Sequence, residues 1–404
     1  MSEAFIIDGV RTPVGRYGGA LASIRPDDLA ALVIGEVVKR SKINPAAVEE
    51  VIFGNANGAG EENRNVARMA WLLADLPREV PGYTVNRLCA SGMTAIISAS
   101  QMIRSGDADI VVVGGVESMT RAPWVVEKPG KAWAKPGESY DTSIGWRFPN
   151  PRFESGELSR EGKMTYSMPE TAEEVAERFE ISREDADAFA VESHKKAFAA
   201  IAAGRFDREI VPVDVVGRKG AITVVDTDEG PREGTTMEVL AKLRPVVKQG
   251  GVVTAGNSSS LNDGASAVVL ASEAAISKYN LVPRARVVRG ASAGVDPEIM
   301  GIGPVPATQK VLDRAGWSIS DLGAVELNEA FATQSLATIR QLGLDHEIVN
   351  RNGGAIALGH PLGSSGSRIA ITLLNRMEQE GVDKGLATMC VGVGQGTAIL
   401  LERV

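Results

Sequence analysis

Cysteine, aromatic residues and long apolar runs are all scarce in this sequence. Only 2 of its 404 residues are Cys, at positions 89 and 390, so a disulfide framework is excluded. No 18 consecutive residues are apolar, which excludes a membrane-spanning helix. Basic residues form no cluster and the formal net charge is −8, so we expect neither nucleic acid nor a membrane as a partner.

What the chain does contain is typical of a globular protein. Apolar residues make up 44% and charged residues 23%, which excludes a disordered chain. Its length predicts about two or three domains. The first and last residues resemble neither a secretory signal nor a peroxisomal address, and free thiols suit a reducing compartment. We therefore expect a cytoplasmic protein.

Short apolar runs alternate with helical patterns along the whole chain. Runs bounded by glycine are typical of strands that are buried on both faces of a parallel sheet. They cover residues 4–8, 50–55, 108–115, 285–290, 324–328 and 397–402. Helical patterns between them include residues 27–39 and 94–103. This alternation predicts an α/β fold.

Three segments of the first half recur in the same order about 270 residues later. The pairs are residues 85–92 with 349–356, 46–55 with 321–328, and 108–118 with 386–396. The recurrence predicts two tandem copies of one α/β fold with a further unit between them. We expect an N-terminal half at 1–119 that is completed by 251–277, an inserted loop or lid domain at 120–250, and a C-terminal half at 278–404. Within the insertion, capping-box patterns predict helix starts at Thr171 and Ser182.

Cys89 follows a predicted strand and directly precedes a predicted helix. Unpaired N–H groups and the dipole at a helix N-terminus favour a thiolate, so this position suits a reactive cysteine. A buried structural cysteine is the alternative, and the local sequence does not separate the two.

His360 is one of only three histidines and follows a glycine-rich turn. On such a loop an imidazole can accept the proton of a thiol, although it can also simply satisfy hydrogen bonds of the loop. His194 lies in a helical run, and we expect it to be solvated.

Cys390 and Asn328 both come at the ends of predicted strands in the second half. Cys390 precedes glycines at 392, 394 and 396, which let backbone N–H groups approach a ligand closely. A strand follows this turn, so it is no dinucleotide fingerprint. Asn328 suits either a helix cap or a holder of water or a carbonyl oxygen. Ligands bind at the carboxyl ends of strands in open α/β sheets, and a doubled fold brings both sets of loops to one site.

Five sequence blocks together resemble the thiolase family. They are NRLCASGM (86–93), GNSSSLNDGA (256–265), LNEAFA (327–332), NGGAIALGHPLGSSG (352–366) and CVGVGQG (390–396). They occur in the family's order across essentially the whole chain. The resemblance implies a duplicated α/β fold, in which two similar halves form a layered α-β-α-β-α core with an inserted loop domain. It also implies a homodimer or homotetramer and a coenzyme A-dependent acyltransferase. Coenzyme A and acyl-CoA would be substrates, with no permanently bound cofactor and no metal.

The resemblance assigns roles to the residues that match the family's motifs. Cys89 would be the acylated nucleophile, His360 its base, and Cys390 the acid and base at the substrate α-carbon. Asn328 would hold a water that forms an oxyanion hole with His360, and the N–H groups of Cys89 and Gly392 would form another. The matching binding residues are Arg232 near the coenzyme A phosphates, Ser259 near pantetheine, and Met168, Met300 and Phe331 around the acyl pocket.

The sequence departs from the family pattern at two positions. Ala90 replaces a usual Gly, which is a small change. Ser167 stands where short-chain biosynthetic thiolases usually carry His, which argues against acetoacetyl-CoA as the substrate of an acetyl-CoA C-acetyltransferase.

Three other readings fit the sequence less well. The catalytic site of a β-ketoacyl synthase would resemble a Cys-His-His set, but the third residue of the set is Cys390 in this sequence. A cysteine protease would need neither Cys390 nor the glycine turn. A thiolase relative that binds acyl-CoA without catalysing a reaction would not need all four candidate catalytic residues, which are Cys89, Asn328, His360 and Cys390.

The substrate is narrowed by two further segments. Residues 60–77 and 141–151 look most like 3-oxoadipyl-CoA thiolases of aromatic-acid degradation, although general 3-oxoacyl-CoA thiolases of fatty-acid degradation share the first. We expect reversible Claisen cleavage of a 3-oxoacyl-CoA to acetyl-CoA and a shortened acyl-CoA. A dicarboxylate substrate needs a cation, which Arg147 or Arg152 would supply. The alternative, that both are solvated loop residues, is slightly favoured.

Overall fold

The computed structural model describes residues 2–158 and 164–404 of the chain. A ten-stranded mixed sheet runs through the molecule in the order β12-β13-β14-β11-β1-β10-β5-β3-β4, with β2 (Gly15–Arg16) beside β10. The N-terminal strands are β1 (Ala4–Arg11), β3 (Glu50–Gly54), β4 (Gly82–Val85), β5 (Ile110–Ser118) and β10 (Asn262–Ser272). The C-terminal strands are β11 (Ala285–Gly294), β12 (Ala324–Leu327), β13 (Lys384–Val391) and β14 (Gln395–Arg403). The two half-sheets meet where β1 and β11 share two residue pairs.

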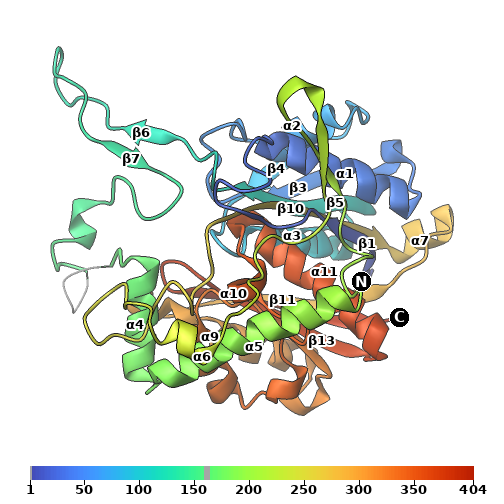
Figure 1. Cartoon of the computed structure of the whole chain (residues 1–404). Helices are drawn as coiled ribbons and strands as arrows, with labels where there is room; N and C mark the ends of the chain where they lie inside the picture. The colour runs from blue at the N-terminus through green and yellow to red at the C-terminus, as the bar shows by residue number, and fades with distance from the viewer. Residues whose placement is uncertain (1, 159–163) are drawn as a thin grey trace.

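Helices cover both faces of each half-sheet and create five layers (Figure 1). On the outer face of the N-terminal half-sheet lie α1 (Pro26–Ser41) and α2 (Val66–Leu73). Between the half-sheets lie α3 (Ser91–Ser105) and α11 (Leu362–Glu380). The outer face of the C-terminal half-sheet packs against α8 (Pro304–Ala315) and α9 (Ala332–Leu342). The predicted layered α-β-α-β-α fold is confirmed.

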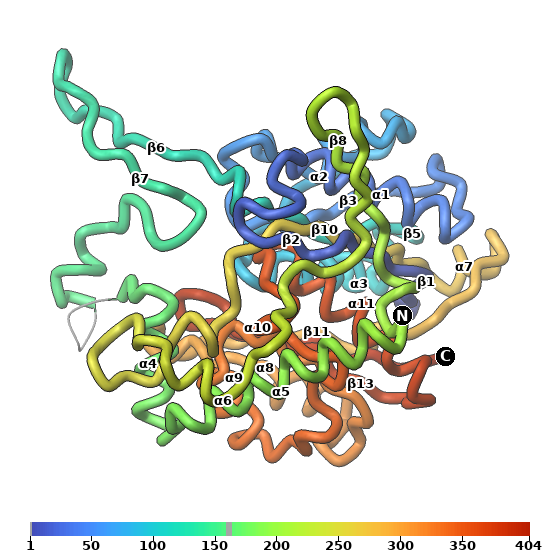
Figure 2. The backbone as a smooth tube through the Cα atoms, viewed as in Figure 1, coloured from blue at the N-terminus to red at the C-terminus, as the bar shows by residue number. Residues whose placement is uncertain are grey.

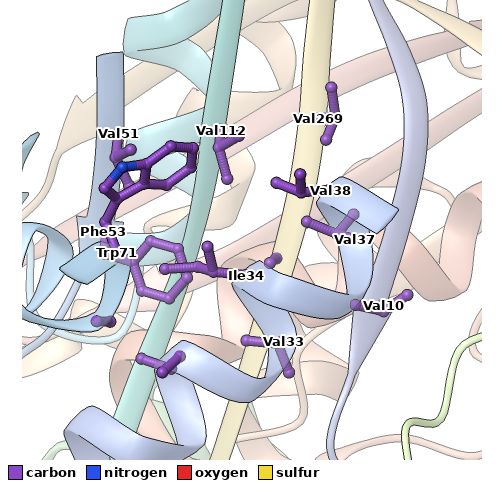
Figure 3. Packing of buried hydrophobic residues seen from close by; sticks show 14 of the residues in the cluster. Val10, Val33, Ile34, Val37, Val38, Val51, Phe53, Trp71, Val112 and Val269 are labelled. Carbon is purple, nitrogen blue, oxygen red and sulfur yellow. The ribbon is translucent and has the colours of Figure 1, made fainter. Parts of the chain in front are cut away.

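Burial on both faces explains why the strands read as continuous apolar runs. Every residue of β5 and of β10 is buried. We expected a parallel sheet from these runs, but most neighbours are antiparallel, and only β3–β4, β3–β5 and β12–β13 are parallel. The apolar pattern therefore reports the helical layers and not the strand direction. Figure 3 shows one such layer, where Trp71 of α2 and Ile34 of α1 pack over Val112 of β5.

The internal repeat is confirmed by strand order, because β1-β10-β5-β3 corresponds to β11-β14-β13-β12. The edge strand β4 has only a single-bridge counterpart, between Val325 and Val349. The central helices begin at Ser91 and Leu362, which are 271 positions apart, whereas Val85 and Val349 are 264 apart. The seven extra residues hold the short helix α10 (Ala355–Leu358). Cys89 and His360 consequently stand at equivalent places, each two residues before a central helix.

The segment between the halves contains helices and two small hairpins. The hairpins are β6–β7 (Trp124–Val126, Ser139–Asp141), which projects from the body in Figure 2, and β8–β9 (Val213–Val216, Ile222–Val225). The helices are α4 (Met168–Arg178), α5 (Arg183–Ala202) and α6 (Met237–Leu240). Helix α7 (Glu273–Tyr279) follows β10. Short 3-10 turns lie at Pro45–Ala47, Pro151–Phe153, Arg218–Gly220, Pro297–Ile302, Ile319–Asp321 and His346–Ile348. The domain boundaries stay a prediction.

Of the two helix starts expected in this segment, one is confirmed and one is wrong. Ser182 caps α5, and its side chain accepts the N–H of Asp185. Helix α4 begins three residues before Thr171, because Ser167 forms the capping box with Glu170. Pro169 in its first turn fits a helix start there. Within the described residues no helix has the length and apolar character that crossing a bilayer requires.

The central helices touch through small residues at their N-termini. A Cβ added to Gly92 of α3 would lie 2.5 Å from Ser367 Oγ and 2.7 Å from the carbonyl oxygen of Gly363 in α11. Only glycine fits this approach without moving the backbone. The contact holds the residues just before both helices next to each other.

Gly92→Ala is expected to lower the free energy of unfolding by about 1–3 kcal/mol, because the added methyl group forces α3 and α11 apart. Urea unfolding measures the change. The matched control is Gly35→Ala in α1, where the nearest atom to the new Cβ is Ala74 Cβ at 3.9 Å. That variant should gain about 0.5–1 kcal/mol from helix propensity. A Gly92→Ala protein as stable as the parent would contradict the proposed tight contact.

Candidate active site

A cleft of about 680 Å³ opens where strand ends of both halves meet the inserted segment. Cys89 and Glu117 contribute from the N-terminal half, and Leu362 and Gly392 contribute from the C-terminal half. The inserted segment adds Thr142–Arg147, Ser167–Glu170 and Val246–Val247. The cleft thus lies at the carboxyl ends of the strands, as expected for an α/β sheet.

Cys89 is placed by a strained turn directly before α3. Leu88 has a positive φ of 47°, an unfavourable conformation for a residue with a side chain. Ser91 stabilises this turn, because its hydroxyl accepts the N–H of Arg87 and donates to the carbonyl of Leu88. Two N–H groups approach the Cys89 sulfur, that of Gly392 and its own. The helix-terminal position expected from the sequence is confirmed.

The charge state of Cys89 differs from the expectation. Its place before α3 predicted a lowered pKa, but burial raises the pKa of Cys89 to about 11, and the Glu117 carboxylate adds to the rise. The two N–H groups oppose the rise without cancelling it. The physical reason is that removal of water costs a thiolate more than a helix end returns. Cys89 is therefore a thiol at neutral pH and needs a base to become a nucleophile.

His360 is buried and oriented by its neighbours. The Ser365 hydroxyl donates to the carbonyl of Pro361 at 2.9 Å, so its oxygen is left to accept the Nδ1–H of His360 at 2.6 Å. Nε2 therefore carries the lone pair, and Asn328 Nδ2 lies 3.4 Å from it. Burial first, and the positive charge of Arg368 second, lower the pKa of His360 to about 3. At neutral pH this imidazole is uncharged and able to accept a proton.

Asn328 lies between β12 and α9 but does not cap the helix, whose N-cap is Phe331. Its side chain is fully buried, and Oδ1 has no hydrogen-bond partner among the described residues. A buried amide oxygen of this kind is ready to accept a hydrogen bond from a water or a ligand.

Cys390 ends β13 and is fully buried. It packs in an apolar cluster with Met300 and Phe331, against which Met168 also lies. Burial raises the pKa of the Cys390 thiol, and the nearby Cys89 adds to the rise. In the turn that follows, Gly394 has φ 68°, and a Cβ there would lie 2.2 Å from the carbonyl oxygen of Val295. Glycine is therefore required for the turn that presents the Gly392 N–H.

Of the five predicted binding residues, Met168 lines this cleft, whereas Arg232, Ser259, Met300 and Phe331 do not. Arg232 is exposed, and Ser259 is half-buried with its N–H bonded to the carbonyl of Ala330. The expectation that His194 is solvated is wrong. It is buried, its Nδ1 accepts the N–H of Arg232 at 3.2 Å, and burial lowers its pKa to about 4. The helical pattern could not reveal the distant segment that covers it.

The sequence reasoning missed Glu117 and Ser365. Glu117 is buried at the end of β5 and accepts N–H groups from Ala56, Asn57 and Gly363. Burial raises the pKa of Glu117 to about 7. A carboxylate at the end of an all-apolar strand was a readable signal, whereas nothing local marked Ser365.

Of the two arginines that we considered as binding partners for a dicarboxylate, one lines the cleft and the other does not. Arg147 lines the cleft, whereas Arg152 is exposed and pairs with Glu157 at 3.1 Å. Among the residues that the structure describes, no group of three or more His, Cys, Asp or Glu is arranged to hold a metal ion. Cys89 and Gly392 thus line the cleft together, and the buried Cys390 thiol lies close to Cys89. Two neighbouring thiols with converging N–H groups are suited to acyl transfer.

Comparison with known proteins finds similarity over nearly the whole chain. Residues 4–274 match the family model of the thiolase N-terminal domain, and residues 281–403 match that of the thiolase C-terminal domain. The chain is 54% identical to a beta-ketoadipyl-CoA thiolase of Pseudomonas putida over 410 residues, covering 100% of both chains. It is 52% identical to a 3-oxoadipyl-CoA/3-oxo-5,6-dehydrosuberyl-CoA thiolase of Escherichia coli K12, again over 100% of both. The crystal structure of the Bacillus anthracis acetyl-CoA acetyltransferase superposes with a TM-score of 0.93 at 42% identity, covering 100% of this chain and 99% of that one.

Ser365→Ala is expected to lower the rate of acyl transfer about tenfold or more, because His360 Nδ1 loses the acceptor that fixes its tautomer. Single-turnover acylation by acetyl-CoA measures it. Ser367→Ala is the matched control, since this serine lies two residues further along α11 and its hydroxyl bonds to Ser266 of β10 and not to His360. Equal rates for the two variants would count against orientation of His360 by Ser365.

Proposed function

This chain belongs to the thiolase family, and we propose that it cleaves 3-oxoadipyl-CoA with coenzyme A to give succinyl-CoA and acetyl-CoA. The observation that carries the chemistry is the convergence of the Gly392 N–H on the Cys89 sulfur, close to the Cys390 thiol. The buried His360–Asn328 pair would supply the base and the second oxyanion hole. The identity to beta-ketoadipyl-CoA and 3-oxoadipyl-CoA thiolases over the full chain supports the substrate. The class of enzyme is an acyltransferase.

Acylation couples the attack of the Cys89 sulfur to the transfer of its proton to His360 Nε2. The raised pKa of Cys89 and the lowered pKa of His360 favour a neutral resting pair, so the proton moves as the sulfur attacks the 3-oxo carbon. The N–H groups of Cys89 and Gly392 then form an oxyanion hole for the oxygen on that carbon. Because they already approach the sulfur, they lie where an acyl oxygen on it would develop charge.

Carbon–carbon cleavage follows from the same intermediate. The bond between C2 and C3 breaks, its electron pair forms the enolate of acetyl-CoA, and a succinyl thioester remains on Cys89. Cys390 gives its proton to C2 of the enolate. His360 and a water held by Asn328 Oδ1 stabilise the enolate oxygen. The thiol of coenzyme A then attacks the succinyl thioester and gives its proton to the Cys390 thiolate. Cys89 leaves as a thiolate and takes back the proton that His360 holds, so that all three groups are restored.

Several features favour 3-oxoadipyl-CoA over acetoacetyl-CoA. Ser167, where short-chain thiolases usually carry His, lines the cleft and caps α4 with its hydroxyl. This hydroxyl, already engaged in capping α4, does not supply an imidazole at that point. Met168, Met300 and Phe331 would enclose the acyl chain beside Cys390.

Other parts of the proposal concern binding and assembly. Arg232 would meet the coenzyme A phosphates and Ser259 the pantetheine, so a bound coenzyme A would reach beyond the residues that line the cleft. Coenzyme A enters and leaves as a substrate, without a permanently bound cofactor. Assembly into a homodimer or homotetramer is supported by exposed aromatic side chains on the projecting hairpin, such as Trp124 at 69% exposure. We place the enzyme in the cytoplasm. We also propose that the two halves and the inserted domain are divided after residues 119, 250 and 277.

Cys89 is expected to carry the acyl group. After incubation with acetyl-CoA, mass spectrometry of a proteolytic digest should find one acetyl group, on the peptide that contains Cys89. His360→Ala should slow this acetylation by about 10²–10⁴-fold, because general-base assistance is lost. Acetylation of another residue would refute the assignment.

Cys390→Ala is expected to accept an acetyl group on Cys89 but to lose exchange of the acetyl-CoA α-protons with deuterated water. Acylation needs only Cys89 and His360, whereas exchange needs a proton carrier at C2. Nuclear magnetic resonance follows the exchange, and Cys89 acetylation in the same sample controls for folding. Full exchange in this variant would assign the proton transfer to a different group.

A further inference from the structure

Arg147 is the only basic side chain among the described residues that line the cleft. It is half-buried, follows β7, and lies in a wall that also includes Ile144 and Trp146. A guanidinium that is partly removed from water loses solvation and gains most from an anionic partner. The described part of the chain offers it none: its only bonds go to Asn57 Oδ1 at 2.8 Å and to the Thr142 carbonyl at 3.5 Å.

Those two neutral contacts hold the guanidinium in place without neutralising it. Asn57 is itself fixed, because its Nδ2 donates to the Thr142 hydroxyl at 2.9 Å and its backbone N–H donates to Glu117. The Thr142 hydroxyl in turn donates to the carbonyl of Pro123 at 2.6 Å. These hydrogen bonds fix the orientation of the Arg147 guanidinium and leave its positive charge available to an anionic ligand.

The acids of the cleft are occupied elsewhere. Glu117 accepts N–H groups from Ala56, Asn57 and Gly363, and Glu170 accepts the N–H of Ser167 in the capping box of α4. Neither is an ion-pair partner of Arg147. An acidic group brought by a ligand would therefore meet an uncompensated positive charge.

A short chain of contacts connects this charge to the reacting sulfur. Glu117 is close enough to Cys89 to raise the pKa of its thiol, Glu117 bonds to Asn57, and Asn57 bonds to Arg147. An acyl group on Cys89 thus lies in the same cleft as the guanidinium. The succinyl group ends in a carboxylate, which the planar guanidinium can bind with two parallel hydrogen bonds.

We propose that Arg147 binds the terminal carboxylate of the acyl group and thereby selects dicarboxylyl-CoA substrates over neutral ones. This inference rests on the proposed function, since it names the residue that distinguishes 3-oxoadipyl-CoA from a monocarboxylic 3-oxoacyl-CoA of equal length. Asn57 is a positioning residue in this arrangement. Arg152 takes no part, because it is exposed and already paired with Glu157.

The test compares kcat/KM for 3-oxoadipyl-CoA with that for 3-oxohexanoyl-CoA, in which a methyl group replaces the carboxylate. The ratio of the two values should be high in the parent enzyme and should fall about 10- to 100-fold in Arg147→Met, the effect of one lost charge-assisted contact. Arg147→Gln should lower the ratio by the same order and serves if the apolar variant does not fold. Arg152→Met is the matched control and should keep the parent's ratio.

Each other outcome has a distinct meaning. A parent enzyme that prefers the dicarboxylate, with the same preference in both Arg147 variants, would overturn the inference and leave the proposed function standing. A parent enzyme without the preference would overturn the proposed substrate and the inference together. If the ratio of kcat/KM values fell as far in Arg152→Met as in Arg147→Met, the inference would also be overturned. An exposed charge outside the cleft would then be enough to explain the preference for the dicarboxylate.

Discussion

The contact between the N-termini of α3 and α11 is the constraint on which the site depends. Each helix belongs to one copy of the repeated fold. A candidate catalytic residue lies two positions before each helix, Cys89 in one copy and His360 in the other. Gly92 allows the backbones of the two helix N-termini to meet, which brings the segments that hold Cys89 and His360 together. The duplication therefore supplies the scaffold, and divergence of two equivalent positions supplies the chemistry. The seven extra residues of the second copy hold α10 immediately before His360.

Burial governs the electrostatics of this site more than helix ends do. It raises the pKa values of both thiols and lowers that of His360, so both thiols and the imidazole are neutral in the resting site. Neutral groups cost little to bury, and charge appears only when substrate arrives. The converging N–H groups and the Asn328–His360 pair are then the fixed dipoles that meet it. Arg147 is the exception, a charge kept in the cleft by neutral contacts.

The sequence predicted correctly those features that depend on residues close together in the chain. The strand at 110–118 and the helix at 26–41 follow from apolar runs and periodicity, and the glycine-rich segments around His360 and Cys390 pointed to the site. The failures involve distant partners: His194 is covered by the segment of Arg232, and the pKa of Cys89 depends on burial by the other half. The start of α4 was wrong because two serine or threonine capping patterns compete four residues apart, and Pro169 favours the earlier one. Ser365 matters only through the rotamer of His360, which no sequence pattern records.

A crystal structure of the Cys390→Ala variant soaked with succinyl-CoA tests the account most directly, because this acyl donor needs no carbon–carbon chemistry. The account predicts a succinyl thioester on Cys89, with its carbonyl oxygen accepting the N–H groups of Cys89 and Gly392. The terminal carboxylate should lie about 2.7–2.9 Å from the nitrogens of Arg147. A thioester oxygen turned away from both N–H groups, or an acyl group on any other residue, would contradict the account.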